Sequence, residues 1–109
     1  MAALTLGEEH NGKELAVRVG DTVVLRLPEN SGGGYRWTLT PVSHEHLETM
    51  EHHFEAPGAG VVGGVGASVW TFKAKRPGHA GLALKKVRPW NADDPAARRF
   101  EVGLDIRGV

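Results

Sequence analysis

The fold is decided by an alternating stretch near the end of the sequence, residues 100–107, which reads FEVGLDIR. Phe100, Val102, Leu104 and Ile106 share one face of such a segment when the chain is extended, and the residues between them are charged or small. A period of two residues is typical of a strand with one face buried and the other face in water. The stretch therefore predicts a β-strand with its apolar face in a core.

The same period recurs along most of the chain. Apolar residues stand at every second position in segments 15–19, 23–27, 35–39, 70–72 and 82–84. The pair Gly20-Asp21 predicts a turn between the first two segments, and Pro28 is expected to end the second because proline lacks a backbone N–H. Trp37 lies on the apolar face of segment 35–39 and is expected to be buried in the core. Residues 44–54 fit a helix and a strand equally well, and we assign them to a strand.

Short alternating strands with frequent turn signals between them predict an all-β fold. About seven strands without a convincing helix favour an immunoglobulin-like antiparallel β-sandwich with Greek-key connections. Alternate connections of such a sandwich emerge at the same end, so three loops are expected to gather there. A chain of 109 residues is long enough for one core, and residues 1–109 are expected to form a single domain.

Composition excludes several classes of function. Lys plus Arg and Asp plus Glu both number 13, so the formal net charge is +0 and no field attracts nucleic acid or an anionic membrane. The chain has no cysteine, which excludes disulfides and thiolate chemistry. No segment approaches the ~20 apolar residues of a membrane span. A native start at Met1 would indicate the cytoplasm, and a removed export signal would indicate the periplasm or secretion.

No motif for catalysis, a metal or a cofactor is evident. Histidines 44, 46, 52 and 53 cluster in the sequence, but no H-E-x-x-H motif occurs and no third ligand accompanies His44 and His46. These histidines are therefore expected to lie on a solvated face. Neither a G-x-S-x-G elbow nor a phosphate-binding glycine loop is present. We expect no enzyme activity, no metal and no cofactor.

Three segments between predicted strands stand out as candidate binding loops. They are residues 30–35, a glycine-rich loop that ends at Gly66, and residues 88–91. Each also has a purely structural explanation. Asn, Ser and Gly are favoured in turns, the glycine-rich run is compatible with a simple connection, and Trp90 is as readily buried against the sandwich as exposed.

At these loops the sequence resembles the chagasin family of cysteine-peptidase inhibitors. The family has R-P-W/F in its third binding loop, and Arg88-Pro89-Trp90 matches it in full. Its second loop carries G-x-G-G before W/F-x-F. Gly63-Gly64-Val65-Gly66 stands at the corresponding place, with Val65 where the family has its third-position glycine.

The first loop of the family carries N-P-T-T-G-Y/F-x-W. Here Asn30, Gly34, Tyr35 and Trp37 match that pattern, whereas residues 31–33 differ from it. Ser31, Gly32 and Gly33 stand where proline and two threonines are usual. The three partial motifs occur in the order of the family and on the expected loops.

The resemblance implies a reversible, competitive inhibitor of papain-like cysteine peptidases whose three loops occlude the active-site cleft. The implied partner is such a peptidase, bound by a monomer without a cofactor. The implied binding residues are Asn30, Ser31, Gly32, Gly33, Gly34, Tyr35, Gly63, Gly64, Val65, Gly66, Arg88, Pro89 and Trp90. Two alternatives stay open: a non-inhibitory immunoglobulin-like adhesion or carbohydrate-binding module, and a diverged relative that keeps only the scaffold.

Overall fold

The computed structural model describes residues 3–29, 35–40, 45–55, 66–88, 90–91 and 97–108. Within these ranges the chain forms eight strands and one 3-10 helix, labelled η1. No helix among them is long and apolar enough to cross a membrane. In chain order the elements are β1 (Ala3–Leu6), η1 (Glu8–His10), β2 (Glu14–Arg18), β3 (Thr22–Glu29), β4 (Arg36–Leu39), β5 (Leu47–Glu55), β6 (Gly66–Ala74), β7 (Gly78–Val87) and β8 (Arg98–Arg107).

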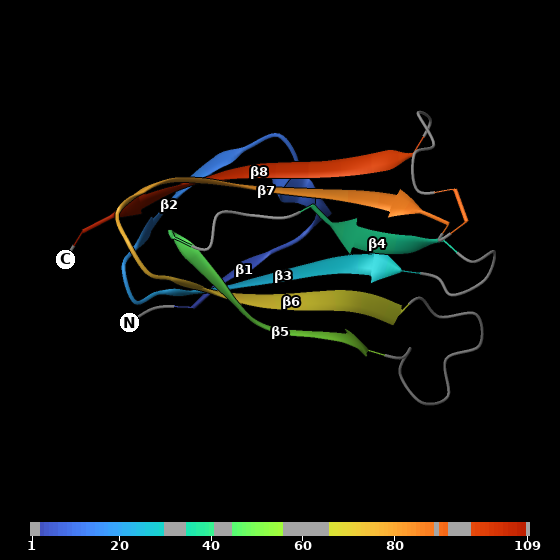
Figure 1. Ribbon diagram of the computed structural model, residues 1–109, viewed down its shortest axis with the longest axis horizontal. Coiled ribbons are helices and arrows are strands. Elements are labelled where there is room, and N and C mark those ends of the chain that lie inside the picture. Colours follow the sequence, from blue (N-terminus) through green and yellow to red (C-terminus); the bar gives the residue numbers. More distant parts are fainter. Residues whose placement is uncertain are drawn as a thin grey trace.

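The strands form two sheets that share one core. One sheet has the order β1-β3-β6-β5 and the other has the order β2-β8-β7-β4. In Figure 1 the long strands of the first sheet occupy the lower half of the molecule and those of the second the upper half, with β4 next to β3. This arrangement confirms the predicted all-β, immunoglobulin-like sandwich.

Two strand pairs are parallel, whereas the sequence analysis expected antiparallel pairing. β1 is parallel to β3 and β2 is parallel to β8; the other described pairings are antiparallel. A tight hairpin joins only antiparallel neighbours, and β2 in the opposite sheet separates β1 from β3 along the chain. β1 itself was not predicted, because its four residues are too few to establish an alternation.

Two further expectations can be compared with the strand boundaries. The assignment of residues 44–54 to a strand is confirmed by β5, which spans Leu47–Glu55 and has a register shift between Thr49 and Glu51.

Pro28 does not end β3, which continues to Glu29. Beyond Leu25, β3 is paired with β6 and no longer with β1. Among the described residues, no strand pairs with that side of β3 beyond Leu25, and a residue without an N–H is tolerated at such an edge.

The predicted apolar faces all point into the space between the sheets. The alternation found in residues 100–107 is confirmed, since Phe100, Val102, Leu104 and Ile106 are each at most 3% exposed. Burial of such side chains contributes about 1.5–3 kcal/mol each relative to exposure. The other large buried members of the core are Leu6, Val17, Val23, Leu25, Leu27, Trp37, Leu47, Trp70, Phe72, Leu82 and Leu84.

Trp37 connects the two sheets. Its side chain is 5% exposed, and its Nε1–H donates a hydrogen bond of 3.0 Å to the carbonyl oxygen of Pro28 in β3. The Nζ of Lys86, the residue paired with Trp37 on β7, lies 5.9 Å from the centroid of its ring. The indole is therefore buried and hydrogen-bonded, as buried tryptophans require.

We expect Trp37→Ala to lower the free energy of unfolding by about 3–5 kcal/mol, because it deletes a large buried ring and leaves a cavity. Urea denaturation followed by circular dichroism measures this loss. Trp90→Ala serves as the control, since Trp90 is 73% exposed and its truncation should change stability by no more than about 0.5 kcal/mol. Similar losses in the two variants would contradict the assignment of Trp37 to the core.

Candidate functional site

The strands that flank the three candidate loops end at the same edge of the sandwich, here called the loop end. β3, β5 and β7 run toward this edge, and β4, β6 and β8 start from it. Figure 1 shows it at the right of the molecule. The residue pairs that close the sheets there are Glu29 with Gly66, Glu55 with Ala67, Arg36 with Val87 and Lys86 with Arg98.

Tyr35 and Arg88 meet at the loop end because they flank the paired strands β4 and β7. The guanidinium carbon of Arg88 lies 4.5 Å from the centroid of the Tyr35 ring and 5.7 Å from the centroid of the Trp90 ring. Both distances are within the ~6 Å over which a cation is attracted to an aromatic face. Arg88 therefore joins an aromatic side chain of the first loop to one of the third. The sequence analysis named all three residues but not this contact.

Trp90 projects into solvent. Its side chain is 73% exposed, so it does not pack against the sandwich, which was the structural alternative considered for it. The N–H of Asn91 donates a hydrogen bond of 2.9 Å to the carbonyl oxygen of Arg88, and this bond closes a turn across residues 88–91. The core does not account for this large aromatic side chain, which together with Tyr35 and Arg88 forms a candidate binding surface.

Glu29 supports the base of the first loop and was missed by the sequence analysis. Its side chain is 4% exposed, and its Oε1 accepts a hydrogen bond of 2.7 Å from the backbone N–H of Trp37. This bond links the last residue of β3 to β4 in the other sheet. Glu29 continues the inward phase of Leu25 and Leu27, so its spacing was the signal that pointed to a buried carboxylate.

Gly66 begins β6 at a position where no side chain fits. A Cβ atom at this residue would lie 2.4 Å from Cζ of Phe54 and 2.5 Å from the backbone oxygen of Glu55. The Phe54 ring therefore occupies the space that a side chain at position 66 would need. Phe54 is itself 43% exposed and was not among the predicted site residues.

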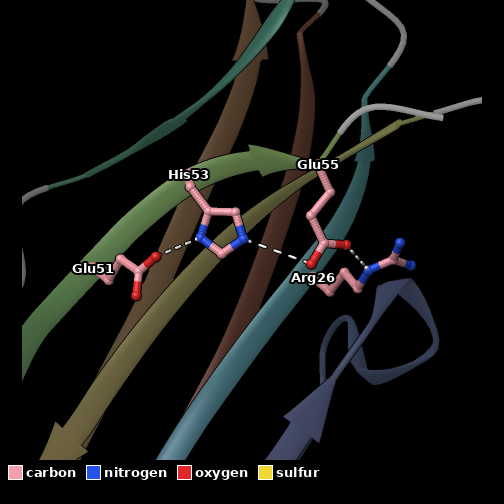
Figure 2. A network of polar contacts seen from close by, with 4 residues as sticks. All are labelled: Arg26, Glu51, His53 and Glu55. Atoms are coloured by element: carbon pink, nitrogen blue, oxygen red, sulfur yellow. Dashed lines mark hydrogen bonds and ion pairs between the residues drawn. The ribbon is translucent and has the colours of Figure 1, made fainter. Parts of the chain in front are cut away.

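Charged side chains cross the outer face of the first sheet close to the loop end (Figure 2). Arg26 Nε lies 3.0 Å from Glu55 Oε2, and the His53 ring lies between Glu55 and Glu51, 3.6 Å and 2.8 Å from their carboxylate oxygens. The hydrogen bond from Arg26 holds the pKa of the Glu55 carboxyl below its ordinary value. This ion pair therefore stabilises the fold above the ordinary pKa of Glu55 and is lost as the pH falls through the lowered value. Because the pair is exposed, its contribution is small.

The structure does not describe every predicted site residue. Tyr35, Gly66, Arg88 and Trp90 lie at the loop end, as described above. Nine predicted site residues lie outside the described ranges: Asn30, Ser31, Gly32, Gly33, Gly34, Gly63, Gly64, Val65 and Pro89. In the part of the chain that is described, no three His, Asp or Glu side chains are grouped closely enough to hold a metal ion.

Comparisons with known proteins identify a family that matches most of the chain. The model of a family described as Chagasin family peptidase inhibitor I42 matches residues 16–104. Chagasin of Trypanosoma cruzi is 31% identical over 99 residues, which cover 87% of this chain and 90% of that protein.

Two solved structures show the shared fold. The cysteine protease inhibitor EhICP2 of Entamoeba histolytica has a TM-score of 0.85 at 21% identity and covers 97% of this chain and 96% of its own. PbICP-C, solved in complex with falcipain-2, has a TM-score of 0.68 at 16% identity, with 98% and 100% of the two chains covered.

We expect Glu29→Ala to lower the free energy of unfolding by about 1–3 kcal/mol, because it leaves the N–H of Trp37 without its carboxylate acceptor. Glu29→Gln keeps an acceptor oxygen in the same place and should lose less. Thermal or urea denaturation measures both, with Glu48→Ala on the exposed face of β5 as the control. A parent-like stability of Glu29→Ala would show that the bond to Trp37 has no net effect.

Proposed function

The chain belongs to the chagasin family of peptidase inhibitors, and we propose that it inhibits papain-like cysteine peptidases reversibly and competitively. Members of the family are inhibitors and not enzymes. PbICP-C, which shares the fold, was solved in complex with falcipain-2, a papain-like cysteine protease. The fold is thus compatible with binding a peptidase of this class.

The observation that carries the proposal is the gathering of three loop bases at one edge, beside an exposed aromatic anchor. Tyr35, Arg88 and Trp90 form a continuous surface there, and Gly66 and Glu29 are paired beside it. Aromatic residues and arginine are enriched among the side chains that dominate binding energies. A projecting edge of this kind is suited to a concave partner such as an active-site cleft.

In the proposed complex the loop end fills the cleft as a wedge. Residues 30–35 lie at its centre, near the catalytic thiolate, and residues 63–66 and 88–90 flank it on either side. Glycine in the first two segments lets the backbone approach the cleft closely. Because the strand ends are held by the two sheets, less conformational entropy is lost on binding than a free peptide would lose. Inhibition then requires occlusion of the cleft and no chemical step.

We expect the protein to inhibit papain and to leave trypsin active, because the proposed loops fit a papain-like cleft and present no evident substrate-like anchor for a serine peptidase. Titration of the protein into each enzyme with a fluorogenic substrate measures this selectivity. Increasing the substrate concentration should relieve inhibition of papain, as competition requires. Equal inhibition of trypsin, or no inhibition of papain, would contradict the proposal.

We expect Trp90→Ala to raise the inhibition constant for papain by about 30-fold, since truncation of a central tryptophan in an interface costs about 2 kcal/mol or more. The melting temperature should stay unchanged, because the side chain is 73% exposed in the free protein. Trp90→Phe keeps an aromatic face and should lose less affinity. An unchanged inhibition constant for Trp90→Ala would remove Trp90 from the binding surface.

A further inference from the structure

Phe54 and Glu55, the last two residues of β5, are each held by a neighbouring strand. The Phe54 ring covers Gly66, the first residue of β6, from the inner side of the sheet. On the outer side, Glu55 pairs with Arg26 of β3 at 3.0 Å, as Figure 2 shows. The chain thus enters and leaves the connection 56–65 through Glu55 and Gly66, two residues whose positions are fixed against the sheet.

The two contacts differ in kind. An exposed ion pair such as Arg26 with Glu55 contributes little, because water and salt screen it. The contact of Phe54 with Gly66 is a close apolar and steric one, and a Cβ at Gly66 would lie 2.4 Å from the ring. The backbone oxygen of Glu55 also lies 2.5 Å from such a Cβ, so the ring and this carbonyl occupy the side of Gly66 where another residue would carry its side chain. Because the contact of Phe54 does not depend on charge, salt does not screen it.

Requirements of the core do not explain an aromatic residue at position 54. Edge strands usually expose charged side chains, which discourage pairing with other chains, and β5 follows that pattern at Glu48, Glu51 and Glu55. Phe54 lies on the opposite, inward face of this strand, in register with Ser68, yet it remains 43% exposed and is not part of the buried core cluster. The ring instead lies against Gly66, which ends the second loop and begins β6.

We propose that Phe54 is a positioning residue that fixes the point where the second loop rejoins the sheet, so that the loop enters a peptidase cleft at the correct place. The proposal rests on the proposed inhibitory function. Fixing the ends of a connection restricts the conformations open to it, and a connection that is already restricted loses less entropy when it binds. Phe54 thus contributes to affinity without being required to touch the peptidase.

The first test measures hydrogen exchange in the free protein and needs no peptidase. In Phe54→Ala the backbone amides of residues 66–68 should exchange about tenfold faster than in the parent, since the ring no longer covers Gly66. Phe54→Tyr retains the ring and should exchange like the parent. Met50→Ala is the matched control, because Met50 is 56% exposed on the same strand but lies away from Gly66. Parent-like exchange in Phe54→Ala, or equal acceleration in Met50→Ala, would overturn the proposal.

The second test measures inhibition of papain by the same variants, well below their melting temperatures. Phe54→Ala should raise the inhibition constant about tenfold, with Phe54→Tyr and Met50→Ala close to the parent. If Trp90→Ala weakens inhibition and Phe54→Ala does not, the positioning role is wrong and the proposed function stands. If the parent itself fails to inhibit papain, the proposed function fails, and hydrogen exchange still decides whether Phe54 holds Gly66. Weaker inhibition without faster exchange would make Phe54 a contact residue and overturn the positioning role.

Discussion

The hydrogen bonds between Trp37 and the end of β3 hold the two sheets together where the three candidate loops leave them. The Trp37 N–H donates to Glu29 and its indole N–H donates to Pro28, so one residue of β4 is held at two points of the opposite sheet. Each bond contributes only about 1 kcal/mol net, but leaving either donor buried and unpaired would cost more. The relative position of the sheets at the loop end therefore depends on this residue.

Trp37 is connected to the other candidate site residues through the strands that pair with β3 and β4. Tyr35 is two residues before Trp37, and the pairing of β4 with β7 brings Tyr35 beside Arg88. Glu29 accepts from Trp37 and is paired with Gly66 across β3 and β6. Residues of all three loop bases are thus connected to one buried side chain through contacts made by adjacent strands. A shift of Trp37 would move the first loop relative to both of its neighbours.

Much of this architecture could be predicted from the sequence, because alternation of apolar residues reports directly on which face of a strand is buried. The faces of β3, β6 and β8 followed from that pattern, as did the core position of Trp37. Individual side-chain contacts have no such signature. The link from Glu29 to Trp37 depends on how the two sheets pack against each other. The approach of Arg88 to Tyr35 and the covering of Gly66 by Phe54 depend on which strands pair within a sheet. The parallel pairing of β1 depends likewise on a path through the other sheet.

The structural role of Gly66 illustrates how one residue can serve two requirements. A motif glycine is readily interpreted as a source of backbone freedom, yet Gly66 does not adopt the positive φ found at Gly12, Gly20 and Gly78. Its lack of a side chain instead leaves room for Phe54. The same feature that allows close approach of backbone to a cleft thus also lets an aromatic ring hold the base of the loop. The missing side chain at Gly66 thus allows a contact that restricts the backbone at the base of the loop. A loop restricted before binding loses less entropy when it binds, as the proposed inhibitor requires.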